Sequence, residues 1–308
     1  MGVTRALPLA LAVGCTWRDG VAPDGGSPDD DSAGHADAAA AAPDWAVQMT
    51  ADDLAELYTR VSPGGSVDLG VAEPAADDGR VARIRLRGDP RLGNDDRTGP
   101  AHASELATLA TNFHHGEYRM RVRLAACKPG EEVVNGLFTY ANDGTDHDGD
   151  GLVDNAEIDL EILCGTPAVI FLTVWTEYTS ATEEFRRWGR VVELTTGAIW
   201  EAPSDREYGI VHVGDDPALA LPDLLDPDGF VELGFSWRAD RVRFFAVAGG
   251  ADVTLGELTD PARIPSRPGA LMFNAWHPGE HWFGDGAPPD YPADDAVLLV
   301  DWARYWRQ

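Results

Sequence analysis

The chain has 308 residues and carries 52 acidic against 24 basic side chains, which gives a net charge of −28. Because nucleic-acid backbones are bound by basic surfaces, this charge argues against a nucleic-acid partner. The length, with 44% hydrophobic residues, allows one large β domain or two ordinary domains.

The first fifteen residues have one basic side chain and then a short apolar run that ends at Cys15. The run is too short to span a bilayer and is typical of a signal peptide. Its last five residues, LAVGC, resemble a bacterial lipobox, in which the cysteine is lipidated; plain secretion and a wrongly assigned start codon are the alternatives. Residues 16–44 are rich in Asp, Gly, Ser, Pro and Ala and predict a disordered acidic linker. We therefore expect an exported protein, extracellular or held at the cell surface through a lipid on Cys15.

From residue 45 onward the sequence predicts β structure, with one exception. Thr50 followed by ADDLAELYTR predicts a short helix over residues 50–60. Apolar or alternating runs bounded by Gly, Pro, Asn or Asp then predict strands, at residues 80–88, 116–126, 135–142, 157–163, 168–178, 186–194, 230–240, 241–250, 269–276 and 296–306. Many strands without alternating helices favour an all-β fold, an antiparallel β-sandwich or jelly roll, that spans residues 45–308 as one domain. We expect it to be a monomer.

One predicted strand, EIDLEIL at residues 157–163, carries acids on alternate positions. Side chains of a strand alternate between its faces, so Glu157, Asp159 and Glu161 share one face and the aliphatic residues share the other. Like charges on neighbouring positions repel one another, so such a row destabilises the fold and suggests a functional role. Two carboxyl groups about 5–5.5 Å apart are what a retaining glycosidase needs. The spacing alone leaves catalysis, metal binding and a chance surface cluster open.

A calcium-loop pattern overlaps this strand. Residues 146–157 read D-x-D-x-D-G-x-x-D-x-x-E, which is dense in oxygen ligands and has a glycine where the loop must turn sharply. We expect a structural calcium ion whose ligands are Asp146, Asp148, Asp150, the carbonyl of Leu152, and Asp154. Glu157, the twelfth position, is expected to stay free for chemistry because it begins the acidic strand. A hydrated acidic hairpin tip without an ion is the alternative.

Several segments in the same order over residues 105–308 resemble glycoside hydrolase family 16, the lichenase and laminarinase group. They are FHHGEYRMRVRLA, GLFTY, EIDLEIL, VELGFSWRADRVRFFAVAGG, IPSRPGALMFNAWHPGEHWFG and VLLVDWARYW. The resemblance implies a concanavalin A-like jelly roll. It implies that Glu157 is the nucleophile, Asp159 its hydrogen-bonding partner and Glu161 the general acid/base.

The resemblance also implies which residues contact sugar. Rings would come from Tyr140, Trp276 and Trp282, and hydrogen bonds from Asn274 and Glu105. The chain departs from the family where Asn155-Ala156 precede the nucleophile, in place of the usual aromatic residue or histidine, and at Ala107, where an arginine is expected.

These observations predict a retaining endo-β-glycosidase that hydrolyses a β-glucan-type polysaccharide through a glycosyl-enzyme intermediate, without a cofactor for catalysis. A transglycosylase would use the same residues. A non-catalytic, calcium-dependent glycan-binding surface protein on the same fold is the alternative from another class. Cys127 and Cys164 are either a disulfide, as an oxidising compartment would allow, or two free thiols.

Overall fold

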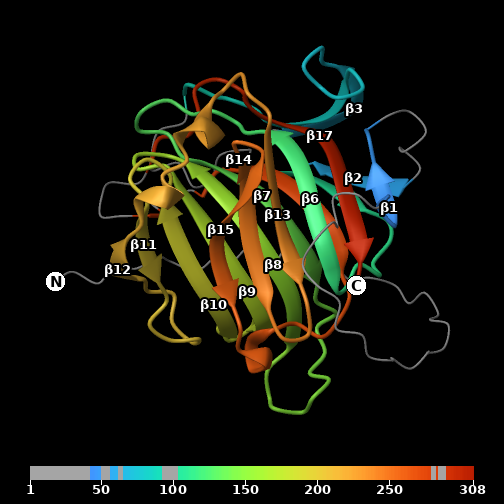
Figure 1. Cartoon of the computed structure of the whole chain (residues 1–308), viewed down its shortest axis with the longest axis vertical. Coiled ribbons are helices and arrows are strands. Elements are labelled where there is room, and N and C mark those ends of the chain that lie inside the picture. The colour runs from blue at the N-terminus through green and yellow to red at the C-terminus, as the bar shows by residue number, and fades with distance from the viewer. Residues whose placement is uncertain (1–41, 50–55, 62–64, 92–102, 279–281, 284–288) are drawn as a thin grey trace.

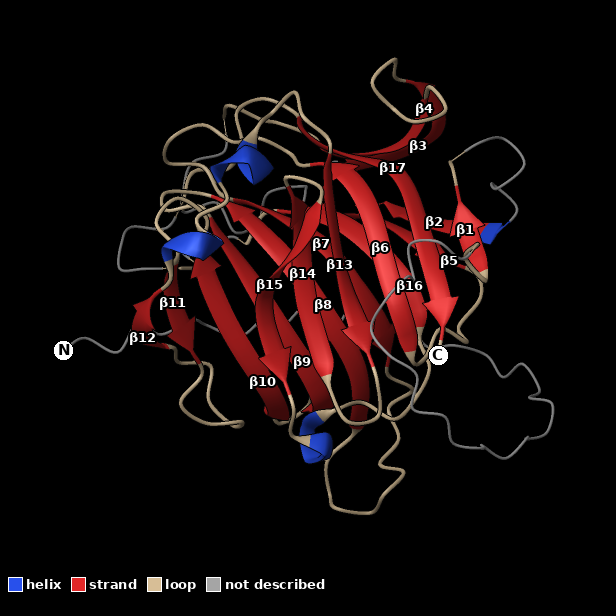
Figure 2. Ribbon diagram, viewed as in Figure 1, coloured by secondary structure: helices blue, strands red, loops and turns tan. Residues whose placement is uncertain are grey.

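The computed structural model describes residues 42–49, 56–61, 65–91, 103–278, 282–283 and 289–308 (Figure 1). The expected signal peptide and lipobox, and all but the end of the expected linker, lie outside this part of the chain. Two antiparallel sheets pack face to face, which confirms the predicted β-sandwich. Figure 2 shows that strands dominate the described chain and that the short helical turns lie in the connections between them. No helix among the described residues is long and apolar enough to cross a membrane.

The first sheet has eight strands. Its members, in spatial order, are β15 (Ala251–Leu258), β14 (Val242–Ala248), β13 (Val231–Trp237), β6 (Gly116–Arg123), β17 (Ala296–Arg307), β4 (Arg80–Leu86) and β3 (Gly65–Ala72), with β1 (Trp45–Val47) paired to β17. Three short 3-10 turns lie in the connections of the described chain: η3 (Pro217–Leu219), η4 (Pro222–Leu225) and η5 (Pro261–Arg263).

The second sheet has nine strands and carries the acidic row on its central strand, β8. Its order is β12 (Val211–Asp215), β11 (Ala198–Glu201), β10 (Glu184–Glu193), β9 (Val169–Thr179), β8 (Asp154–Cys164), β7 (Val133–Ala141), β16 (Ala270–Trp276), β5 (Ala103–Thr108) and β2 (Leu57–Val61). A strand in this position is hydrogen-bonded on both edges, so its side chains are held in register by two neighbours.

The aliphatic face of β8 decides which way the acids point. Ile158, Leu160 and Ile162 are fully buried in the main core between the two sheets, together with Tyr118 and Phe235 of the first sheet. Because successive side chains of a strand point to opposite faces, burial of this face turns the acids away from the other sheet.

All ten predicted strands are present, with ends that agree to within about three residues. The helix predicted over residues 50–60 is wrong for the part that the structure describes. Residues Leu57–Val61 form β2, which pairs with β5 at the edge of the second sheet. Pairing with a sheet edge and burial of Leu57 in the core override the local helix propensity. The sequence patterns also did not reveal the short or edge strands β1, β3, β5, β11, β12 and β15.

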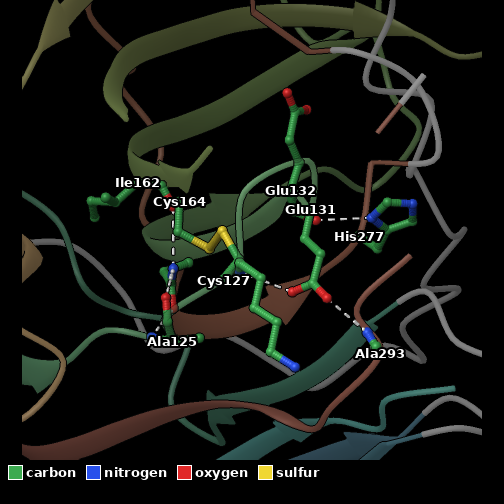
Figure 3. Close-up of a disulfide and its surroundings, with 10 residues drawn as sticks. Ala125, Cys127, Glu131, Glu132, Ile162, Cys164, His277 and Ala293 are labelled. Atoms are coloured by element: carbon green, nitrogen blue, oxygen red, sulfur yellow. Dashed lines mark hydrogen bonds between the residues drawn. A yellow bond between two sulfur atoms is a disulfide. The ribbon is translucent and has the colours of Figure 1, made fainter. Parts of the chain in front are cut away.

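Cys127 and Cys164 form a disulfide (Figure 3). Cys164 is the last residue of β8, and Cys127 lies in the connection between β6 and β7, with a Cα–Cα distance of 5.7 Å. Asn135 reinforces this junction, because its Nδ2 donates to the carbonyl of Ile162 (3.2 Å) and its Oδ1 accepts from the amide of Ala125 (2.8 Å). The end of the acidic strand is therefore tied covalently and by hydrogen bonds to the neighbouring connection.

Candidate active site

The three acids lie side by side on the outer face of the nine-stranded sheet. Each has one direct neighbour on β7 and one on β9 that share its face: Tyr140 and Trp175 beside Glu157, Phe138 and Thr173 beside Asp159, and Gly136 and Phe171 beside Glu161. The pairing is regular from Glu157 onward, and the only shift in register between β8 and β9 lies before it. The expected regular strand with three acids on one face is confirmed.

Asp159 is the most firmly held of the three. It is buried, and its Oδ2 accepts hydrogen bonds from Thr173 Oγ1 (2.6 Å) and from Trp175 Nε1 (3.1 Å). Burial, with the charges of Glu157 and Glu161 added, raises the pKa of Asp159 well above its ordinary value. Glu157 is within hydrogen-bonding reach of this carboxyl group, so the two can share a proton. Sequence reasoning missed Thr173 and Trp175, although they alternate along a predicted strand.

Glu157 is half-buried and receives a hydrogen bond from Asn155 Nδ2 to its Oε2 (2.7 Å). A bulge in β8 precedes it, since Asp154 faces Glu177 while Glu157 faces Trp175. Burial raises the pKa of Glu157 to about 7, although hydrogen bonds with Asn155 and Asp159 oppose this shift. Asn155, one of the departures from the family pattern, is thus a direct partner of the expected nucleophile.

Glu161 is buried, and burial is the main reason why its pKa rises to about 8. The charge of Glu157 raises the pKa of Glu161 further, and the positive charge of Arg187 lowers it. Burial thus raises the pKa of both glutamates, so a carboxyl group of this row can hold a proton near neutral pH, as acid/base chemistry requires.

Arg187 is a cation at this site that sequence reasoning did not find. It lies on β10 opposite Trp175, it is buried, and its guanidinium lies 5.3 Å from the Trp175 ring and 5.4 Å from the Tyr208 ring. Burial lowers the pKa of Arg187 to about 10, so it remains charged near neutral pH. No local pattern marked Arg187, because only the pairing of β10 with β9 places it near the acids.

Asn274 and Glu105 share a row with Glu161. In this row Glu105 of β5 pairs with Asn274 of β16, Asn274 pairs with Gly136 of β7, and Gly136 pairs with Glu161. A side chain at Gly136 would put its Cβ only 2.2 Å from Asn274 Oδ1, so the glycine leaves room for Asn274 to lie over β7. Asn274 Oδ1 is buried without a hydrogen-bond partner among the described residues. It is therefore available to a donor at this site.

Aromatic rings lie at both ends of the acidic row. Tyr140 is half-buried beside Glu157. Near Glu161, the Trp282 ring lies 4.3 Å from the Phe171 ring and 5.2 Å from the Trp276 ring. Trp276 is only 4% exposed and belongs to a small apolar cluster with Val134. Trp282 and Tyr140 thus offer more accessible surface than Trp276 does, and sugar contact by each of the three stays a prediction.

The residues of the expected calcium loop form two groups. Asp146, Asp148 and Asp154 bring carboxylate oxygens within 4.8 Å of one another, and so do Asp148, Asp150 and Glu177. Leu152 lies in the same loop and donates its amide to Asp150 Oδ1 (3.0 Å). Glu157 belongs to neither group, and binding of calcium by the loop without Glu157 stays a prediction.

No protein-family model and no curated protein matches this sequence. Among solved structures, the Bacillus licheniformis β-glucanase matches 87% of this chain and 100% of its own, at 14% identity and a TM-score of 0.51. A prokaryotic β-1,3-1,4-glucanase (lichenase) from a mouse hindgut metagenome matches 86% of this chain and 99% of its own, at 18% identity and a TM-score of 0.50. The chain has the β-glucanase fold.

A third structure, the catalytic domain of an endo-1,3-β-glucanase (laminarinase) from Thermotoga petrophila, matches 85% of this chain and 96% of its own, at 14% identity and a TM-score of 0.50. The resemblance to the lichenase and laminarinase group is thereby confirmed at the level of the fold. Because one fold can host several functions, the activity must be argued from the site itself.

Proposed function

We propose that the protein is a glycoside hydrolase that cleaves β-glucan-type polysaccharides within the chain and retains the configuration of the sugar. One observation carries this proposal. Three acids lie in a row on the outer face of the sheet, with the middle acid held by Thr173 and Trp175 and the pKa of both outer acids raised by burial. A binding protein gains nothing from crowding three like-charged groups, two of them buried and one half-buried, whereas a retaining glycosidase requires two of them.

In the proposed reaction, Glu161 and Glu157 act on opposite sides of the bond that breaks. Glu161 donates its proton to the leaving glycosidic oxygen, and the Glu157 carboxylate attacks the anomeric carbon to form a glycosyl-enzyme ester. Glu161, now ionised, takes a proton from water, which displaces Glu157 and restores both groups. Asp159 accepts two hydrogen bonds from its neighbours and is close enough to hydrogen-bond Glu157, so it orients the nucleophile.

The surroundings of the row support a carbohydrate substrate. Sugar rings have apolar C–H faces that stack on aromatic side chains, and rings flank the row at Tyr140 and at Trp282. The three structural neighbours described above are named as β-glucanases. We therefore propose a mixed-linkage or β-1,3-glucan. We also propose an extracellular or cell-surface location, because a polysaccharide is too large to enter a cell and because the disulfide requires an oxidising compartment. Calcium is the structural ion that we propose for the acidic loop.

A substrate panel tests the proposal. Purified protein is incubated with lichenan, laminarin, xyloglucan and agarose, and reducing ends are measured with product sizes. We expect oligosaccharides from at least one β-glucan. We expect Glu157→Gln to lose at least about 10³-fold in rate, because it removes the nucleophile. The control is Glu257→Gln, an exposed glutamate on β15 of the other sheet, which should leave the rate unchanged.

Two other outcomes would change the assignment. Products longer than the starting oligosaccharide would identify a transglycosylase, in which a sugar hydroxyl replaces water. Equal background signal from the unchanged protein and from Glu157→Gln on every glycan, together with retained binding, would leave a glycan-binding protein.

A further inference from the structure

The loop between β7 and β8 gathers carboxylates at the end of the catalytic strand. Asp146, Asp148 and Asp154 form one close group. The loop folds around Asp146, whose two oxygens accept the amides of Gly149 (2.7 Å) and Gly151 (2.9 Å). Such loops can form without an ion, so the acidic cluster by itself does not establish a metal site.

An independent observation comes from Glu177 on β9, which sequence spacing does not connect with the loop. Glu177 pairs directly with Asp154, and its carboxylate lies within 4.8 Å of those of Asp148 and Asp150. It is only 4% exposed, yet its Oε2 is buried with no hydrogen-bond partner among the described residues. A buried carboxylate oxygen without a donor is strongly disfavoured unless a cation or an ordered water satisfies it.

The side chain of Arg186 already binds two carboxylates of this cluster. Its Nη1 donates to Glu177 Oε1 (2.5 Å) and its Nη2 donates to Asp150 Oδ2 (2.7 Å), so one guanidinium bridges the strand and the loop. The loop and β9 together carry five carboxylates in two groups that share Asp148, whereas Arg186 binds only two of these carboxylates and leaves Glu177 Oε2 without a partner. The charge balance therefore favours a divalent cation.

We propose that the β7–β8 loop and Glu177 form a calcium site in which Glu177 takes the role that sequence spacing gives to Glu157. Asp146, Asp148, Asp150 and Asp154 supply the loop ligands, and Glu177 supplies the carboxylate from the neighbouring strand. A site built from this many carboxylate oxygens suits calcium, which takes six to eight oxygen ligands, better than magnesium, which keeps several of its waters.

The proposed calcium site explains how residues 146–157 can contain both a calcium loop and the proposed nucleophile. Glu157 is turned into the acidic row, where Asn155 holds it, and a glutamate from another strand replaces it at the loop. The ion would join Asp154, which precedes Glu157 by three residues, to Glu177, which follows Trp175 by two. It would therefore fasten the two strands that carry the acidic row and its partners. The calcium site does not depend on the proposed glucanase activity.

Calcium titration of four variants tests the proposal. The full chain is stripped with EDTA, dialysed, and titrated with CaCl2 alone in a calorimeter, and Tm is measured with and without the ion. We expect saturable binding and a Tm increase of several degrees, with a smaller increase from the same concentration of MgCl2. Glu177→Gln should weaken binding at least tenfold, and Glu157→Gln should bind within twofold of the unchanged protein.

The remaining two variants make the result specific. Asp148→Asn alters an exposed residue that both carboxylate groups share, so it should weaken binding without disturbing the core even if Glu177→Gln folds poorly. Glu184→Gln, an exposed glutamate on β10, is the matched control and should bind normally. Loss of binding in Glu157→Gln with normal binding in Glu177→Gln would overturn the proposal, as would the absence of any calcium-dependent heat or Tm change.

Discussion

At the scale of single residues, the site depends on three carboxyl groups that are removed from water and crowded together. Each unit of pKa shift corresponds to about 1.4 kcal/mol of difference between the two protonation states. Burial is the first cause of the raised pKa in Glu157, Asp159 and Glu161 alike. Neighbours then distinguish the groups, since Asn155 favours the charged form of Glu157 while the charge of Glu157 disfavours that of Glu161. These interactions favour ionisation of Glu157 and protonation of Glu161, as the proposed roles require.

The pH dependence of hydrolysis follows from these shifts. Activity needs Glu157 ionised and Glu161 protonated, so it should fall as pH decreases through the Glu157 pKa, about 7, and as pH increases through the Glu161 pKa, about 8. Glu161→Gln should lower the rate on polysaccharide by about 10²–10⁴-fold and abolish the alkaline limb, because the group that titrates there is gone. The measurement is kcat/KM from pH 5 to 10, and an alkaline limb that persists in Glu161→Gln would assign the proton donor elsewhere.

At the scale of elements, cross-strand pairing assembles the site from six neighbouring strands, β5, β16, β7, β8, β9 and β10. Glu161 of β8, Gly136 of β7, Asn274 of β16 and Glu105 of β5 follow one another across the sheet, although they are far apart in sequence. Sequence reasoning placed Asn274 and Glu105 at the site only through the family resemblance. It had no means to place Thr173, Trp175 and Arg187, because the register between neighbouring strands depends on the packing of the whole sheet.

The close approach of Gly136 and Asn274 can be tested directly. In Gly136→Ala the new Cβ would lie 2.2 Å from Asn274 Oδ1, the movable end of a side chain. We expect this end to be displaced, so kcat should fall by about tenfold while Tm changes by only a few degrees. If the glycine acts through Asn274, Gly136→Ala combined with Asn274→Ala should be no less active than Asn274→Ala alone. Additive losses of activity would instead assign Gly136 an independent role.

At the scale of the whole molecule, the sandwich places a reactive strand at the centre of a sheet and buries its other face. The disulfide joins the end of this strand to the connection between β6 of the first sheet and β7 of the second sheet. It therefore ties the strand that carries the acids to the connection between the two sheets. Around the bridge, Glu131 accepts the amides of Lys128 (3.0 Å) and Ala293 (3.0 Å), and the His277 ring contacts the carbonyl of Glu132 (Figure 3). Segments from three parts of the chain thus meet at one junction.

Removal of the disulfide should destabilise the domain. The bridge spans a sequence separation of 37 residues, and closure of such a loop in the unfolded chain contributes roughly 4 kcal/mol in the chain-entropy model. We expect Cys127→Ser with Cys164→Ser, or treatment with a reductant, to lower Tm by roughly 10 °C. The measurement is calorimetry with and without reductant, with the double serine variant insensitive to it. Equal Tm values for oxidised and reduced protein would show that the bridge does not stabilise the fold.

The sequence by itself determined the features that depend on local periodicity. Alternation of acids and aliphatic residues in EIDLEIL puts Glu157, Asp159 and Glu161 on one face of a strand, and glycines and aspartates mark the acidic loop before it. Only the tertiary structure decided the partners of these residues: that residues 57–61 form an edge strand, that Cys127 meets Cys164, that Asn155 and Trp175 hold the acids, and that Glu177 reaches the loop. The physical reason is that these contacts join segments that are far apart in the sequence. Their register is set when the inner faces of both sheets are buried together, and no single stretch of sequence contains that information.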